Sequence, residues 1–498
     1  MNFQAFVFCG KGLKLAPFSN TRGDKGMPKP LLPVANRAML EYVLDWCDQA
    51  QFKEINIVVD EGDEEVMQEG LAGFMQFREE CYDVLSKNVG GFHTHYLRKP
   101  APIQFIGAKS EFTGEILQQE LLERITGDFV LLPCDFITNI PPQIFLDQYL
   151  NRDHDSLAMA VYYQNAFENI DKKQIKKFFT VYTDNEDSMK QPVLLDIYSR
   201  EDVEKTKYLK MRSQMLWRYP NSTVSVKLLN SYIYFCSHEL VHLLSTDDSA
   251  VAADSDGSDS EDEVGSRNPN QIRPSYFRNK TKMVKDPMNG RKSFAKLFRD
   301  IARRSWQHSR PRETVSIFIM PDVGIFIRAN NLSAYMEANR YILKIKSAST
   351  SHTVPVTGSS SAIGADSVIG ASCTILGKTN VKRSVVGANC KIGNRCRIVG
   401  SILLDGAEID DEVTLENVIV GKFGKVGKKT KLTNCYVEGY YSVAPRTVLK
   451  GETLANIYIE GENEFDDSDM DTSSSEESTD QSEMYNEEEY EGDDLFER

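Results

Sequence analysis

The sequence contains no long hydrophobic run and no pattern that directs a chain into or across a membrane. No stretch approaches the ~18 consecutive apolar residues of a membrane-spanning helix. The first residues, MNFQAFVFC, lack the basic and then apolar segments of a secretion signal. The nine cysteines are scattered, and no two of them form a CxxC pair. This usage argues against a disulfide framework or a zinc ribbon and predicts reduced thiols in the cytosol, hence a cytoplasmic protein.

Complete phosphate-binding and metal-binding motifs are also missing. Gly10 and Gly12 follow the apolar run QAFVFC, where backbone N–H groups at a helix start can face a phosphate. No third glycine completes GxGxxG, and no GKS or GKT completes a P-loop. His238 and His242 spell HExxH, but an acidic tract follows almost at once and leaves little ordered chain for a third ligand. The sequence therefore predicts neither a Rossmann or Walker site nor zinc catalysis.

Negative charge is concentrated at the end of the chain. The formal net charge is −15, but residues 460–498 alone hold 18 Asp and Glu against one Arg. The rest of the chain is therefore close to neutral. A segment of this composition buries too little apolar surface to fold, so it is predicted to be a disordered acidic tail. Its Ser and Thr residues lie among acids, which suits acid-directed kinases, and a solubilising role explains the composition equally well.

Short apolar runs alternate with helical patterns over roughly the first 240 residues. The expected strands are QAFVFC, INIVV, IQFIG and FVLLPCD, and helices are expected around residues 39–47 and over residues 113–125. Continuous apolar strands that are separated by helices predict an α/β domain with a mostly parallel sheet.

Two segments of opposite charge follow each other in the middle of the chain. Residues 246–266 are acidic and are predicted to be a disordered insert. Residues 267–313 hold 14 Lys and Arg against three acids. Apolar residues at helical spacing form one face within that basic segment, namely Phe294, Leu297, Phe298 and Ile301. Two interpretations remain open: a packed helix with a solvated basic face, or a nucleic-acid contact.

From residue 363 onward the sequence becomes a repeat with a period of 17 residues. Three sets of five positions keep this spacing, and all fifteen residues are aliphatic: Ile369, Val386, Leu403, Val420 and Val437; Ile375, Ile392, Ile409, Val426 and Val443; Val381, Ile398, Leu415, Leu432 and Leu449. Hexapeptide repeats place one inward aliphatic side chain on each of three flat faces, so that successive coils stack. The repeat predicts a left-handed parallel β-helix of about five coils.

Two polar residues near the apolar runs are candidates for ligand binding. Lys29 stands between two prolines in PKPLLPV, and the stiff chain there is suited to holding its ammonium towards a phosphate. Asp135 ends the run FVLLPCD, and a carboxylate at the carboxyl end of a central strand is suited to Mg²⁺. A surface turn and a turn-capping carboxylate, respectively, explain the same patterns.

The combination of these segments resembles a known superfamily. CGKGLKLAPFS, PKPLLPVANRAM, TGEIL, LLPCD and NSYIYF, followed by hexapeptide repeats, are similar to the sugar-nucleotide pyrophosphorylases, a nucleotidyltransferase superfamily. Within that superfamily, EYVLDWCDQAQFKEI, RRSWQHS and GETLAN resemble the family of gamma subunits of eukaryotic translation initiation factor 2B, of fungal type. The resemblance covers nearly the whole chain apart from the acidic insert and tail.

The resemblance implies the following domains. Residues 1–345 are expected to form a nucleotidyltransferase-like α/β domain, interrupted by the insert 246–266 and the basic segment 267–313. Residues 346–459 are expected to form the left-handed β-helix domain, and residues 460–498 the acidic tail.

Departures from the pyrophosphorylase pattern imply a pseudoenzyme. The family's loop reads GGxGTRLxPLT, so Cys9 replaces a glycine, Leu13 a threonine and Lys14 an arginine that grips the triphosphate. In the family's WxDIGQPxDYLxAN motif, FIRANNLSAYMEAN places Arg328 at the second metal-binding aspartate. A cation there repels Mg²⁺, so no catalytic or metal residue is expected. Gly10, Gly12, Lys14, Lys29 and Asp135 remain candidates for a degenerate nucleotide pocket without a required cofactor, with residual GTP or GDP binding left open.

The family also implies a function and partners. It implies a non-catalytic subunit of the exchange factor that recycles translation initiation factor 2 from its GDP-bound to its GTP-bound form. The implied direct partner is a catalytic epsilon subunit, which forms a heterodimer with this chain. Alpha, beta and delta subunits are implied in a larger hetero-oligomer, and translation initiation factor 2 is the implied substrate. Neither a membrane nor DNA is an expected partner. The alternatives are an active mannose-1-phosphate guanylyltransferase and a hexapeptide acyltransferase; the latter is disfavoured because residues 353–498 contain no His.

Overall fold

The structure is a computed structural model of the whole chain. It describes residues 3–19, 27–88, 99–167, 170, 178–183, 191–245, 288, 290–307, 313–349 and 362–455. The predicted acidic insert and acidic tail, and most of the predicted basic segment, lie outside the described residues. Within the described part of the chain, no helix combines the length and the apolar character needed to cross a membrane.

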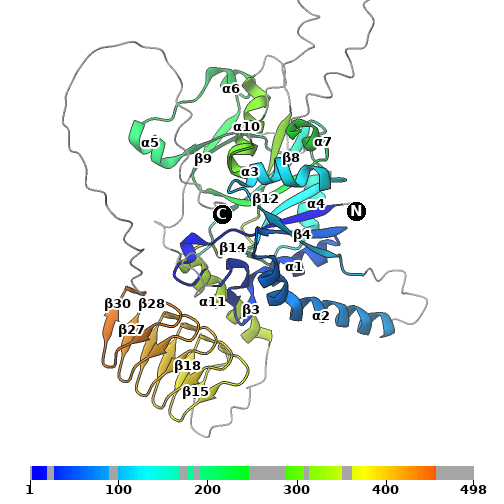
Figure 1. Cartoon of the computed structure of the whole chain (residues 1–498). Coiled ribbons are helices and arrows are strands. Elements are labelled where there is room, and N and C mark those ends of the chain that lie inside the picture. Colours follow the sequence, from blue (N-terminus) through cyan, green and yellow to red (C-terminus); the bar gives the residue numbers. More distant parts are fainter. Residues whose placement is uncertain are drawn as a thin grey trace, which may run out of the picture.

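The α/β domain, which extends to α11 (Leu332–Ser349), is built around a large sheet (Figure 1). This sheet has seven strands in the order β13-β8-β12-β6-β1-β4-β5. Its strands are β1 (Gln4–Phe8), β4 (Glu54–Asp60), β5 (Ile103–Ala108), β6 (Phe129–Pro133), β8 (Ser156–Gln164), β12 (Leu228–Cys236) and β13 (Thr314–Ile319). Neighbouring strands are parallel, except that β12 runs antiparallel to β6 and β8. The predicted α/β domain with a mostly parallel sheet is confirmed.

Helices pack on both faces of this sheet and close two apolar cores. One core includes α1 (Met39–Ala50), α2 (Glu64–Asn88) and α4 (Pro142–Leu150). The other includes α3 (Thr113–Ile116) with its continuation η5 (Leu117–Leu121), α7 (Glu239–Leu244) and α10 (Phe294–Gln307). The helix expected over residues 113–125 is therefore present, but its hydrogen-bonding pattern changes along its length and it ends in η6 (Leu122–Arg124).

Smaller sheets complete the α/β domain. A three-stranded sheet has the order β10-β9-β11 and lies beside α5 and α6. The bounds are β9 (Phe178–Thr183), β10 (Leu194–Ser199), α5 (Arg200–Thr206), α6 (Ser213–Arg218) and β11 (Ser222–Ser225). Two antiparallel two-strand sheets complete the domain. The hairpin of β2 (Pro33–Val34) and β3 (Arg37–Ala38) forms one, and β7 (Phe136–Thr138) pairs with the distant β14 (Phe326–Arg328) in the other.

Residues 362–455 form a stack of short parallel strands in three sheets, which confirms the predicted β-helix (Figure 1). The first sheet contains β15 (Ala362–Ile363), β18 (Asn380–Lys382), β21 (Arg397–Val399), β24 (Thr414–Glu416), β27 (Lys431–Thr433) and β30 (Val448–Lys450). The second contains β16 (Val368–Ile369), β19 (Val385–Val386), β22 (Ile402–Leu403), β25 (Ile419–Val420), β28 (Tyr436–Val437) and β31 (Thr453–Leu454). The third contains β17 (Thr374–Ile375), β20 (Lys391–Ile392), β23 (Glu408–Ile409), β26 (Lys425–Val426) and β29 (Ser442–Val443).

The predicted aliphatic positions fill the interior of the β-helix. Residues 17 apart are strand partners, as in Ile398 with Leu415, and both side chains are buried. Ile369 and Leu449, on the first and last strands of their sheets, are only partly buried because each has a neighbouring strand on one side only. The stack therefore derives its stability from the burial of aliphatic ladders.

The helix α11 (Leu332–Ser349) joins the α/β domain to the β-helix through a shared apolar core. Tyr335 and Leu343 of this helix lie in one apolar cluster with Val385 and Ile402 of the β-helix. Polar contacts reinforce the junction, because Arg340 donates to Asn417 Oδ1 over 2.9 Å. The predicted division of the chain at residue 345 stays a prediction, and α11 extends across it.

Candidate functional site

The candidate residues surround the carboxyl ends of β1 and β6. Gly12 has a left-handed backbone (φ 74°), and a Cβ atom on it would lie 2.9 Å from Lys29 Cβ. Glycine is therefore required there both by the backbone and by the close approach of Lys29. Gly10 lies half-buried just after β1, at the start of the same loop. The loop is therefore packed closely against Lys29.

Lys29 does not extend into solvent. It begins the short helical turn η3 (Lys29–Leu31), with Pro28 before it and Pro30 after it, and it is 6% exposed. Its Nζ donates a hydrogen bond to Asp135 Oδ2 over 2.6 Å. The two sequence candidates are therefore brought together, and the ammonium that was expected to face a phosphate contacts a carboxylate.

Asp135 is the centre of a buried three-residue cluster, which we call the Asp135 cluster: Lys29, Asp135 and Arg328. Arg328 donates from Nε to Oδ1 over 2.8 Å and from Nη2 to Oδ2 over 2.9 Å, a two-point fork. The pairing of β14 with β7 places Arg328 opposite Phe136, directly beside the aspartate. The backbone N–H of Ala329 also donates to the Asp135 carbonyl oxygen over 2.8 Å.

The two cations fix the charge state of the aspartate. Burial by itself raises the pKa of Asp135, since the side chain has no exposed surface. The charges and hydrogen bonds of Arg328 and Lys29 outweigh burial and hold this pKa well below its usual range. Asp135 is therefore ionised at neutral pH, and its oxygens already accept three hydrogen bonds from two cations.

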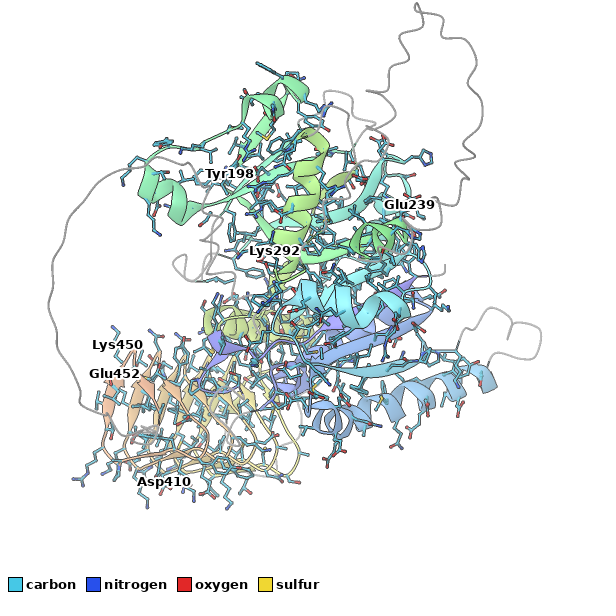
Figure 2. The ribbon with its side chains drawn as sticks, turned by 45° about the horizontal axis from the view of Figure 1, so that its top comes forward. Tyr198, Glu239, Lys292, Asp410, Lys450 and Glu452 are labelled. Atoms are coloured by element: carbon cyan, nitrogen blue, oxygen red, sulfur yellow. The ribbon has the colours of Figure 1, made fainter. Side chains whose placement is uncertain are left out.

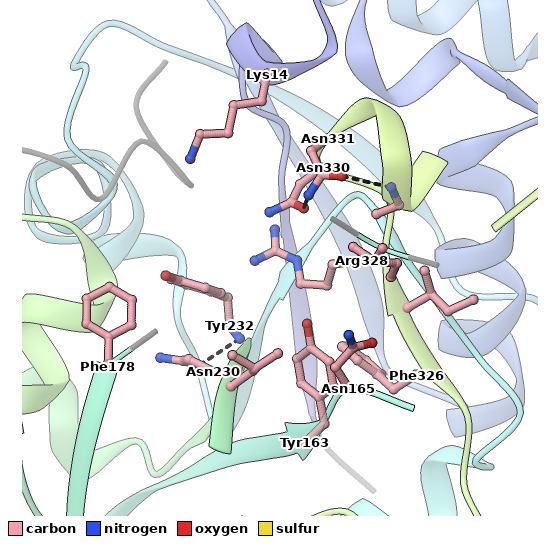
Figure 3. A pocket seen from close by; sticks show the side chains of 14 residues that line it. Lys14, Tyr163, Asn165, Phe178, Asn230, Tyr232, Phe326, Arg328, Asn330 and Asn331 are labelled. Carbon is pink, nitrogen blue, oxygen red and sulfur yellow. Dashed lines mark hydrogen bonds between the residues drawn. The ribbon is translucent and has the colours of Figure 1, made fainter. Parts of the chain in front are cut away.

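A small cavity opens beside the cluster (Figure 3). Its volume is about 70 Å³, and the side chains of Lys14 and Arg328 point into it. The Arg328 guanidinium carbon lies 4.7 Å from the centroid of the Tyr232 ring, within the range of a cation–π contact. Burial raises the pKa of Tyr163, on the same cavity wall, to about 12, so this hydroxyl is neutral. The cavity is thus lined by cations on one side and by aromatic side chains on the other.

The cavity tyrosine Tyr232 was missed by reasoning from the sequence. It lies where the register of β12 on β8 shifts between Asn230 and Tyr234, and its backbone is left-handed (φ 61°). Asn230 Oδ1 accepts the Tyr232 backbone N–H over 2.8 Å and supports this irregular turn. The signal in the sequence was the polar pair Asn230–Ser231 inside an otherwise apolar strand.

The remaining unusual loop residues have separate environments. Cys9 is buried beside Cys134. A hydrogen bond with the Cys9 side chain lowers the pKa of Cys134, although burial opposes the shift. Leu13 is 47% exposed at the outer side of the loop, away from the core. Neither residue donates to the Asp135 carboxylate.

The HExxH residues occupy a short packed helix. His238 precedes α7 and His242 lies within it, and their ring centroids are 5.7 Å apart. The His238 backbone N–H donates to Asp128 Oδ1 over 3.0 Å. Among the residues that the structure describes, no group of three His, Cys, Asp or Glu side chains is arranged to hold a metal ion.

The basic segment contains the packed helix α10. All four apolar residues of the predicted face are buried in the core. Two arginines of the helix are bound to carboxylates, Arg303 to Asp196 over 2.9 Å and Arg304 to Glu313 over 3.4 Å. The described part of this segment therefore favours the packed-helix interpretation over a nucleic-acid contact.

Comparisons with known proteins agree with this architecture. Residues 350–449 match the family described as the LbH domain of the epsilon subunit of EIF2B. The chain is 27% identical over 470 residues to translation initiation factor eIF2B subunit gamma of Schizosaccharomyces pombe. The alignment covers 92% of this chain and 90% of that relative. The resemblance predicted from the sequence is confirmed.

Proposed function

We propose that this chain is a non-catalytic subunit of an eIF2B-type guanine nucleotide exchange factor, acting in the cytosol. Together with a catalytic epsilon subunit it recycles translation initiation factor 2 from its GDP-bound to its GTP-bound form. Its similarity to an eIF2B gamma subunit over 92% of its length supports the place in the complex. The Asp135 cluster is the observation that carries the non-catalytic role.

The cluster does not fit a divalent cation. Mg²⁺ binds through carboxylate oxygens that are free to coordinate it. Both oxygens of Asp135 accept hydrogen bonds from Arg328, and Oδ2 also accepts one from Lys29. The resemblance places Arg328 where pyrophosphorylases have their second metal-binding aspartate. Arg328 therefore supplies positive charge from the protein itself at the place where the superfamily binds a metal ion.

The space beside the cluster is also small. Small-molecule pockets usually have volumes of about 300–1,000 Å³. The cavity that Lys14 and Arg328 line has about 70 Å³. Lys14 presents a single ammonium instead of the planar fork of an arginine, which weakens two-point binding of a phosphate. These features support a pocket that keeps the fold of a nucleotide site without its chemistry.

Assembly is the remaining role. We propose direct pairing with the epsilon subunit, with alpha, beta and delta subunits completing the hetero-oligomer and translation initiation factor 2 docking on the assembly. The β-helix supports this proposal because its first and third sheets carry exposed charged pairs, Arg397 with Glu416 and Lys391 with Glu408, whereas the second sheet packs on the α/β domain.

Native mass spectrometry of the tagged endogenous protein tests the assembly. We expect it to be recovered with an epsilon-like subunit and with further initiation-factor subunits. Recovery as a lone homo-oligomer would overturn the proposed place in the complex.

An enzymatic assay tests the non-catalytic role separately. The purified chain is incubated with GTP, Mg²⁺ and mannose 1-phosphate, and pyrophosphate release is measured against a no-enzyme control. We expect no release above the control. Sustained release that is lost in Asp135→Asn would show that the site still transfers guanylyl groups.

A further inference from the structure

The outer surface of the β-helix carries charges in columns. Side chains 17 residues apart face outward on adjacent coils and contact one another. Lys391 and Lys425 bind the two oxygens of Glu408 over 2.9 and 3.0 Å. Arg395 and Lys429 contact the two oxygens of Glu412 over 3.5 and 3.7 Å.

These columns form layers of alternating sign. The segment 391–397 contains three cations and no acid, and the segment 408–416 of the next coil contains five acids and no cation. The segment 425–431 again contains only cations, with four lysines. Lys391 and Lys425 contact Glu408 from opposite sides, and their hydrogen bonds lower the pKa of this carboxyl group.

The alternation stops at the last coil. The equivalent segment there, 442–450, contains no acid and adds two more cations, Arg446 and Lys450. The outward cations of these last two coils lie on the third sheet, on the first sheet and on the turns that join the two. Together we call them the C-terminal basic face: Lys425, Lys428, Lys429, Lys431, Arg446 and Lys450. All of them are exposed. Lys450 marks the position of the face at the end of the β-helix (Figure 2).

The C-terminal basic face has acids on one side only. Lys425, Lys428 and Lys429 contact acids of the preceding coil. Lys431, Arg446 and Lys450 make no ion pair with any residue that the structure describes, and Arg446 stands one coil from Lys429 in the same column. Like charges at this spacing repel one another, so an added acidic layer would complete the alternation and lower the electrostatic free energy.

We propose that the C-terminal basic face is a docking surface for the chain's own acidic segment, residues 460–498. That segment holds 18 acids and one Arg, which complements the sign of the face. Its first acid, Glu460, follows the last described residue, Ala455, by only five positions. A tethered segment experiences an effective concentration of millimolar order, so even weak contacts are populated.

The acidic segment is also long enough to extend across the C-terminal basic face. Adjacent strands of a sheet lie ~4.8 Å apart, so the two coils of the face occupy roughly 10 Å along the stack. The segment comprises 39 residues, and an extended chain covers about 3.4 Å per residue. The docking does not depend on the proposed place in an exchange factor.

Lysine acetylation of the full chain tests the proposal. Rates at individual lysines are followed by mass spectrometry in the natural chain and in a chain of equal length whose 18 tail acids are replaced by the corresponding amides. We expect acetylation of Lys431 and Lys450 to be several-fold slower in the natural chain at low salt. We expect Lys391, on the neutralised part of the same surface, to react equally in both chains, and the difference at Lys431 and Lys450 to vanish at high salt.

Carbodiimide cross-linking shows which segment binds the C-terminal basic face and whether it belongs to the same chain. Mixed heavy-isotope and light-isotope protein distinguishes links within one chain from links between copies. We expect links within one chain from tail carboxylates to the face, lost in K428E/K431E/R446E and retained in the matched charge reversal K207E/K210E/R212E. Equal acetylation of both chains, links only between copies, or tail-independent binding of single-stranded RNA to the same lysines would each overturn the proposal.

Discussion

The Asp135 cluster and the β-helix surface both place a carboxylate between two cations, but in opposite environments. Asp135 has no exposed surface and lies between Lys29 and Arg328. Glu408 is 35% exposed and lies between Lys391 and Lys425, which are 70% and 61% exposed. The donor–acceptor distances are similar, at 2.6–3.0 Å. Geometry alone therefore does not separate the two arrangements.

The two arrangements differ in how a charge is solvated after its ion-pair partner has been removed. Around Glu408, water and salt solvate a charge whose partner has been removed, so exposed ion pairs contribute only about 0–1 kcal/mol. Around Asp135, all three side chains are almost fully buried, and removing one partner of a buried pair typically costs about 3–5 kcal/mol. The buried cluster is consequently a fixed part of the α/β domain, whereas the surface layers are free to exchange partners.

The largest expected effect comes from removing the charge at the centre of the buried cluster. Asp135→Asn leaves Lys29 and Arg328 as two buried cations without a counter-charge. We expect the free energy of unfolding to fall by about 3–5 kcal/mol, measured by denaturant titration. The matched control Asp153→Asn, on an exposed loop, is expected to change it little. A loss no greater than that of the control would contradict the role of the cluster.

The stability difference between the natural chain and Asp135→Asn depends on pH in a direction that follows from the lowered pKa. Because the folded-state pKa of Asp135 is lowered, its stabilisation is complete above the unfolded-state value of about 3.9 and is lost as the pH falls towards the folded-state pKa. We therefore expect the stability difference between the natural chain and Asp135→Asn to be constant near neutral pH. It should shrink only once the pH drops below about 4.

A second large effect is expected inside the β-helix, beneath the charged layers. Leu415 is fully buried between Ile398 and Leu432. Leu415→Ala leaves a cavity in the ladder, so we expect a loss of about 2–5 kcal/mol. Thr414→Ala, on the neighbouring residue, is the matched control and should have a much smaller effect. Equal losses for the two variants would mean that the aliphatic ladder does not dominate the stability of the stack.

Removing one cation from the buried cluster should have an intermediate effect. Arg328→Met leaves the neutral pair of Lys29 and Asp135 in place, so the hydrogen bonds of the charged guanidinium to Asp135 and its contact with the Tyr232 ring are lost. We expect a decrease of about 1.5–3 kcal/mol in the free energy of unfolding. A decrease larger than that of Asp135→Asn would show that the cluster is not centred on the aspartate.

The smallest effect is expected on the β-helix surface. Glu408→Gln breaks contacts with two exposed lysines, so the loss should lie within roughly 0–1 kcal/mol and should disappear at high salt. The effect of Asp135→Asn should persist at the same salt concentration because the buried cluster is not screened. Thermal melts at low and high salt check both expectations. A salt-insensitive loss at Glu408 would remove the distinction between the two regions.

The sequence predicts those features that depend on one class of side chain at a fixed spacing. The inward positions of the β-helix accept only aliphatic residues, so Val386, Leu403 and their equivalents are readable from the sequence. The apolar runs likewise predicted strands β1, β4, β5 and β6. The charged layers had the same period, yet outward positions tolerate many residue types, and their alternation became visible only once the coils were stacked.

The site was only partly predictable. Lys29 and Asp135 were selected one at a time from local pattern, but 106 residues separate them, and their direct contact depends on the tertiary fold. Arg328 was found only through the resemblance to pyrophosphorylases. Tyr232 was missed because its position depends on a register shift between β12 and β8, which the alternation of apolar residues does not reveal.

The response to Mg²⁺ tests the central proposal, that Arg328 stands in the place of a metal ion. Melting temperatures are measured for the natural chain and for Arg328→Asp, without and with millimolar Mg²⁺. We expect the natural chain to be indifferent to the ion, and Arg328→Asp, which sets two carboxylates side by side, to be destabilised and then partly restored by Mg²⁺. Stabilisation of the natural chain by Mg²⁺ that is lost in Asp135→Asn would contradict the proposal.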